Sequence, residues 1–196
     1  MKLLPNENRR TFVVDEATEA RLVGASSDLM RHLIPFAIDT GLRAGEIVAL
    51  TWNDVDYTAD EPIAVHVRAG KTRFARRTVP LTKRAAASLV ALRAARVDGC
   101  PHVFTRYEGR HPLTVEWMSG RFKRTRRPLG ISEECCFHSL RHTACTRWGA
   151  AGASAFEIQR LAGHSSIEIS ARYTHPEQDQ LRAAIARMGK IKFREG

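Results

Sequence analysis

The chain has 196 residues, of which 43% are hydrophobic, and carries a formal net charge of +10 at pH 7. This length fits one domain with its own core, and the sequence has no apolar run long enough for a membrane-spanning helix. The polar N-terminal residues around Pro5 do not fit a secretory signal, so we expect a cytoplasmic protein. The basic excess indicates a polyanionic partner, usually nucleic acid, with a generic basic protein as the alternative.

The first quarter of the chain predicts helices behind a short lead-in. Residues 1–14 read as a lead-in or linker, and Asp15 is a suitable N-cap for a helix that ends near residue 23. Apolar residues spaced for one helical face predict a second helix over 28–39, which Gly41 ends. A third short helix is expected over 44–50.

The pattern changes over residues 63–80, where apolar and polar residues alternate on both sides of Ala69-Gly70-Lys71-Thr72. This alternation predicts an antiparallel hairpin or small sheet with a basic tip. Thr82 is a suitable N-cap for a helix to about residue 96, and glycines and prolines over 99–112 indicate loops. Further helices are expected at about 115–126, 140–151, 155–161, 167–173 and 176–188.

These elements together predict a mainly α fold with a small antiparallel β-sheet, an α+β class. We expect one domain over 15–188, which includes the helix at about 176–188, and a tail over 189–196. The four cysteines have no metal-ligand spacing, so we expect reduced, mostly buried thiols. They are Cys100, Cys135, Cys136 and Cys145.

Six side chains able to do chemistry lie beside turns and helix ends. They are Arg43, Lys71, His138, Arg141, His164 and Tyr173. Two arginines and a histidine can hold the non-bridging oxygens of a phosphodiester, while a tyrosine can form a reversible covalent link to phosphorus. A lysine can protonate the departing oxygen. A cationic clamp of this kind does the work of a metal ion, so we expect neither a cofactor nor a bound metal.

Four segments in this order resemble the tyrosine recombinase (phage integrase) family. They are TGLRAGEIVALTWNDVD, GKTRFARRTVPL, FHSLRHT and LAGHSSIEISARYTH, and the resemblance covers roughly residues 11–188. It implies the catalytic-domain fold of that family. It also implies a site-specific recombinase or integrase, which cleaves and rejoins DNA without ATP or metal through a 3′-phosphotyrosine.

The resemblance implies that the scissile phosphate is bound by three residues of this chain. Arg43 and Arg141 neutralise it, and His164 donates a hydrogen bond to it. Glu46 matches a supporting acidic position that orients side chains without reacting. The alternative for Arg43 and Glu46 is an ordinary surface pair three residues apart on a helix.

The resemblance also implies how the bond is broken. Tyr173 attacks phosphorus, Lys71 acts as general acid for the 5′ oxygen, and His138 assists proton transfer, with His142 packed close by. Lys71 has the alternative of a solvated turn lysine. His138 and His142 have the spacing of a metal pair, but Ser139 stands where the zincin pattern needs Glu, so we expect no metal site.

Other basic side chains are expected to contact double-stranded DNA. They are Arg73, Arg76, Arg77, Arg121, Lys123 and Arg124, with Arg106, Arg110, Arg126 and Arg127 as further contributors. For Arg73, Arg76 and Arg77 the alternative is exposure to solvent. The run RFKRTRR has a solvated helix face as its alternative. Apolar residues on one face of 176–188 suggest docking onto a second copy of the chain in a cyclic assembly on DNA, or packing onto the chain's own core.

Family members usually carry a further N-terminal domain that clamps the DNA. This chain starts near the catalytic domain, so we expect a truncated or a minimal relative. As a protein that acts on DNA, it is expected at the nucleoid. Three other functions stay open at this point: topoisomerase-like DNA relaxation, DNA binding without catalysis, and a metal-dependent nuclease.

Overall fold

The computed structural model of the chain describes residues 12–68, 76–106 and 111–174. Most of the expected lead-in over 1–14 therefore lies outside the described residues. The same holds for Lys71 and Arg73, the helix expected at about 176–188, and the tail over 189–196.

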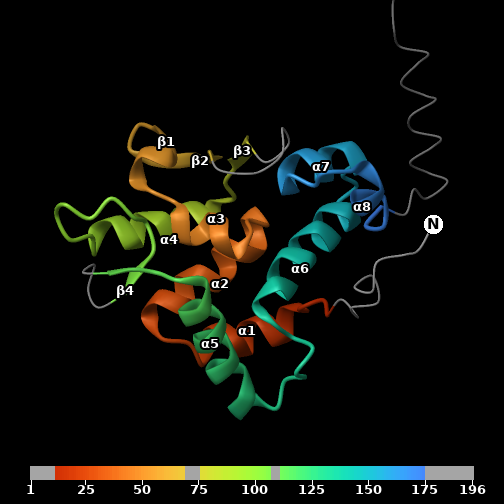
Figure 1. Cartoon of the computed structure of the whole chain (residues 1–196), viewed down its shortest axis with the longest axis horizontal. Helices are drawn as coiled ribbons and strands as arrows, with labels where there is room; N and C mark the ends of the chain where they lie inside the picture. Colours follow the sequence, from red (N-terminus) through yellow and green to blue (C-terminus); the bar gives the residue numbers. More distant parts are fainter. Residues whose placement is uncertain (1–11, 69–75, 107–110, 175–196) are drawn as a thin grey trace, which may run out of the picture.

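Helices make up most of the described chain, and the predicted mainly α class with small antiparallel sheets is confirmed (Figure 1). The α-helices are α1 (Glu16–Gly24), α2 (Asp28–Thr40), α3 (Ala44–Ala49), α4 (Lys83–Ala94), α5 (Val115–Arg126), α6 (Phe137–Ala150), α7 (Ala155–Ala162) and α8 (Ile167–Ala171). Two 3₁₀ segments, η1 (Trp52–Asp54) and η2 (Arg127–Leu129), complete the helical set. The predicted caps are confirmed, since Asp15 accepts a hydrogen bond from the Thr18 N–H and Thr82 accepts one from the Ala85 N–H.

The predicted hairpin is part of a three-stranded antiparallel sheet in the order β1-β2-β3. Its strands are β1 (Val55–Thr58), β2 (Glu61–Val67) and β3 (Arg77–Pro80). Val65 of the central strand pairs with Val55 on one side and Val79 on the other, and all three side chains are buried. The region expected as loops holds a second pair, β4 (Thr105–Arg106) with β5 (His111–Pro112).

Helix α6 begins at Phe137, earlier than the predicted start at residue 140. The reason is local, because the Ser139 hydroxyl accepts a hydrogen bond from the Cys136 N–H and so satisfies a free donor at the helix start. His138 therefore lies in the first turn of α6, on the same helix as Arg141 and His142.

The core surrounds α2, which packs against α1, α4 and α6. Leu33, Ile34 and Phe36 of α2 are fully buried, and the Phe36 ring lies 5.1 Å from that of Phe104. In Figure 1 the sheet and α4 lie on the upper left, while α6 crosses to α7 and α8 on the upper right. The C-terminal end of α2 faces α6, because Arg141 of α6 donates to the Gly41 carbonyl oxygen.

A second small apolar cluster lies between α6 and α7. Cys145, Ile158 and Ala162 are buried in it, and Trp148 and Tyr173 pack against it. This cluster fixes the end of the described chain, including Tyr173, against α6.

Candidate active site

The sharp turn after α2 sets the position of the first candidate residues. Gly41 has a left-handed backbone with φ 59°, and a Cβ there would lie 2.5 Å from the Trp148 ring. Glycine is therefore required both for the backbone conformation and for the close approach. The turn points the Gly41 carbonyl toward α6, and Arg43 follows two residues later as the N-cap of α3.

Arg141 is buried, with 5% of the residue exposed, and is held by two carbonyl oxygens. Its Nη1 donates to Gly41 O at 2.6 Å and its Nη2 to Ala162 O at 2.7 Å. Neither acceptor is a carboxylate, so the charge of Arg141 is not neutralised by these bonds. Burial, with the nearby positive charge of Arg43, lowers the pKa of Arg141 to about 10, and the group stays protonated at neutral pH.

Arg43 and Glu46 form the expected pair, but it does not lie on a solvated surface. Arg43 Nη1 donates to Glu46 Oε1 at 2.9 Å, and Arg43 Nη2 donates to Gly163 O at 2.7 Å. The Glu46 side chain is 10% exposed, whereas 41% of the Arg43 side chain remains exposed. Arg43, Arg77 and Arg141 together form the arginine cluster, and Arg43 is its solvent-exposed member.

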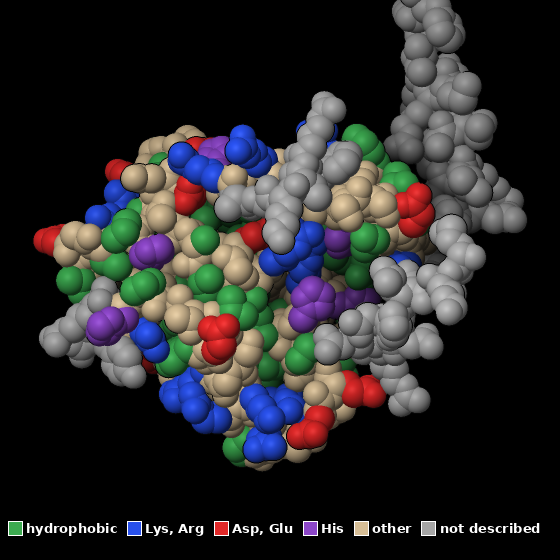
Figure 2. Space-filling model, viewed as in Figure 1, with side chains coloured by type: hydrophobic (Ala, Val, Ile, Leu, Met, Phe, Trp, Pro, Cys, Tyr) green, Lys and Arg blue, Asp and Glu red, His purple; other side chains and the backbone are tan. Residues whose placement is uncertain are grey.

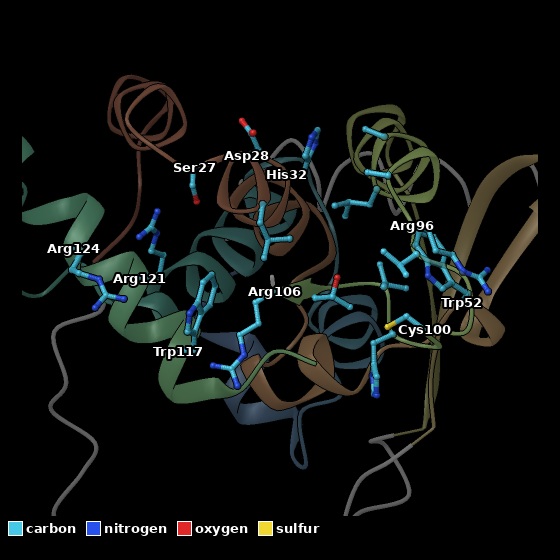
Figure 3. Close-up of a pocket in the computed structure, with 18 residues that line it drawn as sticks. Ser27, Asp28, His32, Trp52, Arg96, Cys100, Arg106, Trp117, Arg121 and Arg124 are labelled. Carbon is cyan, nitrogen blue, oxygen red and sulfur yellow. The ribbon is translucent and has the colours of Figure 1, made fainter. Parts of the chain in front are cut away.

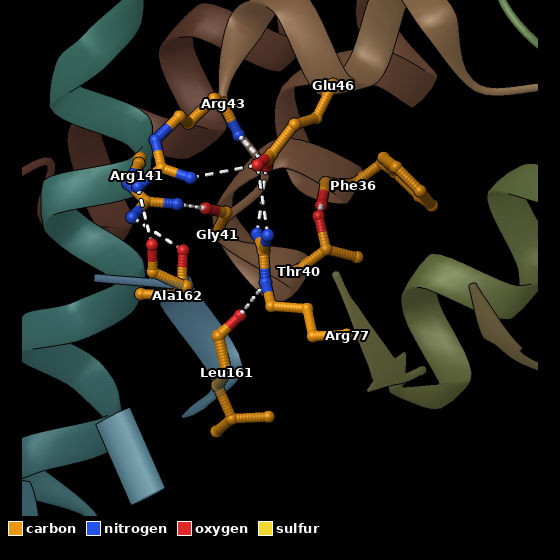
Figure 4. A network of polar contacts seen from close by, with 10 residues as sticks. Phe36, Thr40, Gly41, Arg43, Glu46, Arg77, Arg141, Leu161 and Ala162 are labelled. Atoms are coloured by element: carbon orange, nitrogen blue, oxygen red, sulfur yellow. Dashed lines mark hydrogen bonds and ion pairs between the residues drawn. The ribbon is translucent and has the colours of Figure 1, made fainter. Parts of the chain in front are cut away.

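Arg77 lies in the interior, which corrects the expectation that it contacts DNA or solvent. Its guanidinium binds both carboxylate oxygens of Glu46, at 2.9 and 2.8 Å, and its Nε donates to Leu161 O at 2.7 Å (Figure 4). Only 6% of the side chain is exposed, because strand β3 packs against α7. Burial alone would raise the pKa of Glu46, but the hydrogen bonds and charges of Arg77 and Arg43 outweigh it and lower that pKa.

His164 follows the left-handed Gly163 at the end of α7, and only 7% of it is exposed. Its Nδ1 lies 2.8 Å from the Ser170 hydroxyl, which fixes the orientation of the ring. Burial, and then the charges of Arg141 and Arg43, lower the pKa of His164 to about 3. The imidazole is therefore neutral at physiological pH.

Tyr173 lies between two imidazoles. Its hydroxyl is 2.9 Å from His142 Nδ1, and its ring stacks on that of His164 with centroids 6.2 Å apart and an interplanar angle of 17°. Burial raises the pKa of the phenol. Burial, together with the charges of His138 and Arg172, lowers the pKa of His142. Both partners are therefore neutral at pH 7.

Of the two histidines of HSLRH, the structure brings His142 rather than His138 into contact with Tyr173. His138 lies one turn earlier on α6 and is exposed. The i, i+4 spacing places both imidazoles on one helix face. Only the position of Tyr173 decides which of them reaches the phenol, so the sequence alone could not distinguish them.

Gly149 is a residue that the sequence analysis missed. A Cβ at this position would lie 1.9 Å from the carbonyl oxygen of Tyr173. The backbone carrying the phenol therefore rests directly on α6, and only glycine leaves room for it. Its signal in the sequence was faint, since Gly149 is followed closely by Gly152 in a segment that reads as an ordinary helix end.

The other basic residues fall into different environments. Arg76, Lys123 and Arg124 are exposed and Arg121 is half-buried. Figure 2 shows basic side chains at the lower edge of the molecule, where Figure 1 places α5. Arg126 was expected among the DNA contacts, but it is buried and donates to Ile131 O at 3.0 Å, so this expectation is wrong.

Within the described ranges, the side chains of His, Cys, Asp and Glu form no group of three or more that could hold a metal ion. In the same part of the chain, no helix combines the length and apolar character needed to cross a membrane.

The sequence of the chain is similar to a known protein family and to curated proteins. The profile of the phage integrase family matches residues 13–180. Tyrosine recombinase XerC of Chlamydia caviae is 33% identical over 149 residues, which cover 74% of this chain and 46% of that protein. XerC of Bacillus licheniformis is 32% identical over 160 residues, covering 76% and 50%. The chain thus spans about half the length of the curated relatives it matches.

Two solved structures show the shared fold. The Tn1549 transposon integrase, in complex with circular intermediate DNA, superposes with a TM-score of 0.73 at 22% identity, covering 94% of this chain and 69% of that one. The XerA recombinase gives a TM-score of 0.69 at 24% identity, covering 92% and 64%.

The close packing at Gly41 predicts a specific cost of adding one methyl group. We expect Gly41→Ala to lower the free energy of unfolding by about 2 kcal/mol or more, because it combines a left-handed backbone with a clash against Trp148. The matched control is Gly120→Ala inside α5, where a Cβ meets nothing within 4 Å and alanine favours the helix. Urea unfolding of both variants measures the difference, and equal effects would contradict the packing argument.

The buried ion pair predicts a coupled loss of stability. We expect Glu46→Gln to cost about 3 kcal/mol in urea unfolding, because it leaves the Arg77 charge buried without its partner. The double variant Glu46→Gln, Arg77→Met should lose less than the sum of the single variants. Asp60→Asn, which disrupts the exposed pair with Arg93, should leave stability nearly unchanged. Additive losses at positions 46 and 77 would show that the pair is not coupled.

The lowered pKa of His164 predicts a pH dependence of stability. Between its ordinary value of 6.5 and about 3, the unfolded chain binds a proton at this residue that the folded chain does not. Stability therefore falls as the pH decreases through this window, by up to about 1.4 kcal/mol per pH unit from this group. Unfolding curves at several pH values should show a shallower decline for His164→Gln than for the unsubstituted chain. Parallel declines would contradict the assignment.

Proposed function

The chain belongs to the phage integrase family, and on this premise we propose that it cleaves and rejoins DNA strands with Tyr173 as the nucleophile. The observation that carries the proposal is the position of the Tyr173 hydroxyl, which lies 2.9 Å from the neutral imidazole of His142 and within the electrostatic influence of Arg172 and the buried Arg141. A phenol in this place has a proton acceptor on one side and a fixed positive charge beside it.

The phosphate is bound by the arginine cluster. Arg141 is preorganised by its two carbonyl contacts, and Arg43 is half-exposed and able to turn toward a bound anion. Together they match the two non-bridging oxygens of a phosphodiester, whose charge increases in the transition state. The neutral His164 adds a hydrogen-bond donor through the ring nitrogen that does not face Ser170.

The chemical step involves two proton transfers, one from the attacking Tyr173 hydroxyl and one to the departing 5′ oxygen. The Tyr173 oxygen attacks phosphorus while the phenolic proton passes to His142, and the bond from phosphorus to the 5′ oxygen breaks. Lys71, by resemblance to the family, gives its proton to that oxygen, which leaves a 3′-phosphotyrosine and a free 5′ hydroxyl. The reverse attack by a 5′ hydroxyl rejoins a strand, and His138 remains the second candidate for proton transfer on α6.

We propose double-stranded DNA as the substrate and site-specific recombination or integration as the outcome. The net charge of +10 supports DNA binding, as do the exposed Arg76 and Lys123. Related proteins are described as bound to DNA, and lambda integrase is described as a tetramer on a Holliday junction. We extend this to self-association of this chain in a cyclic assembly on DNA, at the nucleoid, without a cofactor.

The proposal predicts a covalent protein–DNA adduct that resists SDS and forms in the presence of EDTA. The substrate is a pool of randomised duplexes, nicked so that the cleaved end diffuses away and the reaction becomes irreversible. We expect the adduct with the unsubstituted chain and not with Tyr173→Phe, because phenylalanine lacks the attacking oxygen. Tyr57→Phe is the matched control and should form the adduct normally.

An adduct formed by Tyr173→Phe would show that Tyr173 is not the nucleophile. Cleavage that EDTA abolishes would favour a metal-dependent nuclease. DNA binding by the unsubstituted chain with no adduct in any variant would favour a non-catalytic binder.

A further inference from the structure

A cavity of about 910 Å³ lies between α2, α4 and α5, away from the arginine cluster. It is lined by the first turns of α2, the end of α4 with the loop after it, β4, and one side of α5. None of Arg43, Arg141 and Tyr173 lines it. The cavity touches α2 at Asp28 and His32, whereas the arginine cluster lies beyond the last turn of the same helix, roughly 14 Å further along its axis.

The cavity is basic. Arg96, Arg121 and Arg124 line it, and Asp28 is the one acidic residue among its lining residues. Among the described residues, no carboxylate makes an ion pair with any of these three arginines. By contrast, Arg84 and Arg147 are both paired with Glu19. Unpaired guanidiniums around one concave site favour an anion.

The walls of the cavity contain aromatic rings and unsatisfied nitrogen atoms. Figure 3 shows Trp117 on the α5 side, close to Arg121, and Trp52 across the cavity beside Arg96. Trp52 is only 8% exposed, and its Nε1 has no hydrogen-bond partner. The same holds for Nδ1 of His102, which also lines the cavity. A buried N–H without an acceptor is costly, and an acceptor-rich ligand would satisfy it.

We propose that this cavity binds a small anion carrying a planar ring, of the size and chemistry of a nucleoside monophosphate. The volume lies within the range of small-molecule sites, which combine apolar walls with a few convergent polar groups. The arginines suit a phosphate or carboxylate, the tryptophan rings suit a flat heterocycle, and Trp52 Nε1 suits a ring acceptor. This site is independent of the proposed strand cleavage, since none of its residues takes part in that chemistry.

On this proposal, the basic residues of α5 have two different roles. Arg121 and Arg124, which were expected on DNA, line the cavity, while Lys123 does not. Lys123 is exposed on the same helix and remains available to a DNA backbone. The ligand would bridge α2 and α5, and thereby stiffen the helix that ends at Gly41.

The test is calorimetric titration of the purified chain at fixed ionic strength with the four common nucleoside monophosphates. Tryptophan fluorescence gives a second readout, because two of the three tryptophans line the cavity. Adenosine and inorganic phosphate are titrated separately, so that the contribution of the ring and that of the charge are each measured alone. We expect saturable one-to-one binding of at least one monophosphate, tighter than either half alone.

Substitutions localise the site. Arg121→Gln and Arg96→Gln should each weaken binding by about tenfold, since each removes a charge-assisted hydrogen bond. Trp52→Phe should weaken binding while keeping an aromatic ring in place. Arg93→Gln is the matched control. It removes the same charge from α4, but Arg93 stacks over Tyr57 at 4.7 Å and should have no effect.

Three results would overturn the proposal. The first is the absence of saturable binding by any of the four monophosphates below about 1 mM. The second is equal weakening by Arg93→Gln, which would indicate general charge attraction. The third is competitive displacement by a short DNA duplex, which would assign the cavity to the DNA surface. Tyr173→Phe should bind the monophosphate normally, so a failed adduct assay and a failed titration are distinguishable.

Discussion

The site depends on three guanidiniums held close together around a single carboxylate. Arg43 and Arg77 share Glu46, whereas the guanidinium of Arg141 donates to two backbone carbonyl oxygens. Burial, and then repulsion from the charge of Arg43, lower the pKa of Arg141, so holding these cations together has a cost. What offsets it is the backbone. The acceptors are the carbonyls of Gly41 at the end of α2 and of Leu161, Ala162 and Gly163 at the end of α7. These are carbonyls that a helix end leaves without intrahelical partners, at the negative pole of each helix dipole.

This use of helix ends explains why two left-handed glycines border the cluster. Gly41 and Gly163 each end a helix with a positive φ, and the chain then turns within two residues to a candidate site residue, Arg43 or His164. The excess of positive charge in the cluster follows from the same arrangement. Carbonyl dipoles stabilise the cations without cancelling their charge, so the cluster keeps a net positive charge for a substrate. A second carboxylate in place of those carbonyls would have stabilised the cluster and weakened its attraction for phosphate.

The sequence predicted the parts of this arrangement that are local. Asp15 and Thr82 are caps recognisable from the residues that follow, and Gly41 is recognisable as a helix stop. The resemblance to the family placed Arg43, Arg141, His164 and Tyr173 in one site, and the structure brings them together.

Arg77 could not be predicted, because it sits in an alternating strand pattern that also suits an exposed arginine. Its burial comes from Leu161, which is 84 positions away in the chain. The two-residue strands β4 and β5 are too short to produce a period, and Gly149 is explained only by the backbone of Tyr173.

The electrostatic environment of Tyr173 bears on when its phenol would react. Burial keeps the phenol protonated and His142 neutral, so without substrate there is little tendency for the proton to move between them. On the proposed mechanism, a phosphodiester bound by Arg43 and Arg141 brings a negative charge next to both rings. A nearby anion favours the protonated imidazole and so raises the pKa of His142, which makes it a better proton acceptor. The charge that the arginines recognise is therefore also the charge that prepares His142 to accept the phenolic proton. On the same proposal, burial holds back the Tyr173 phenol as a nucleophile until a phosphate is held in place.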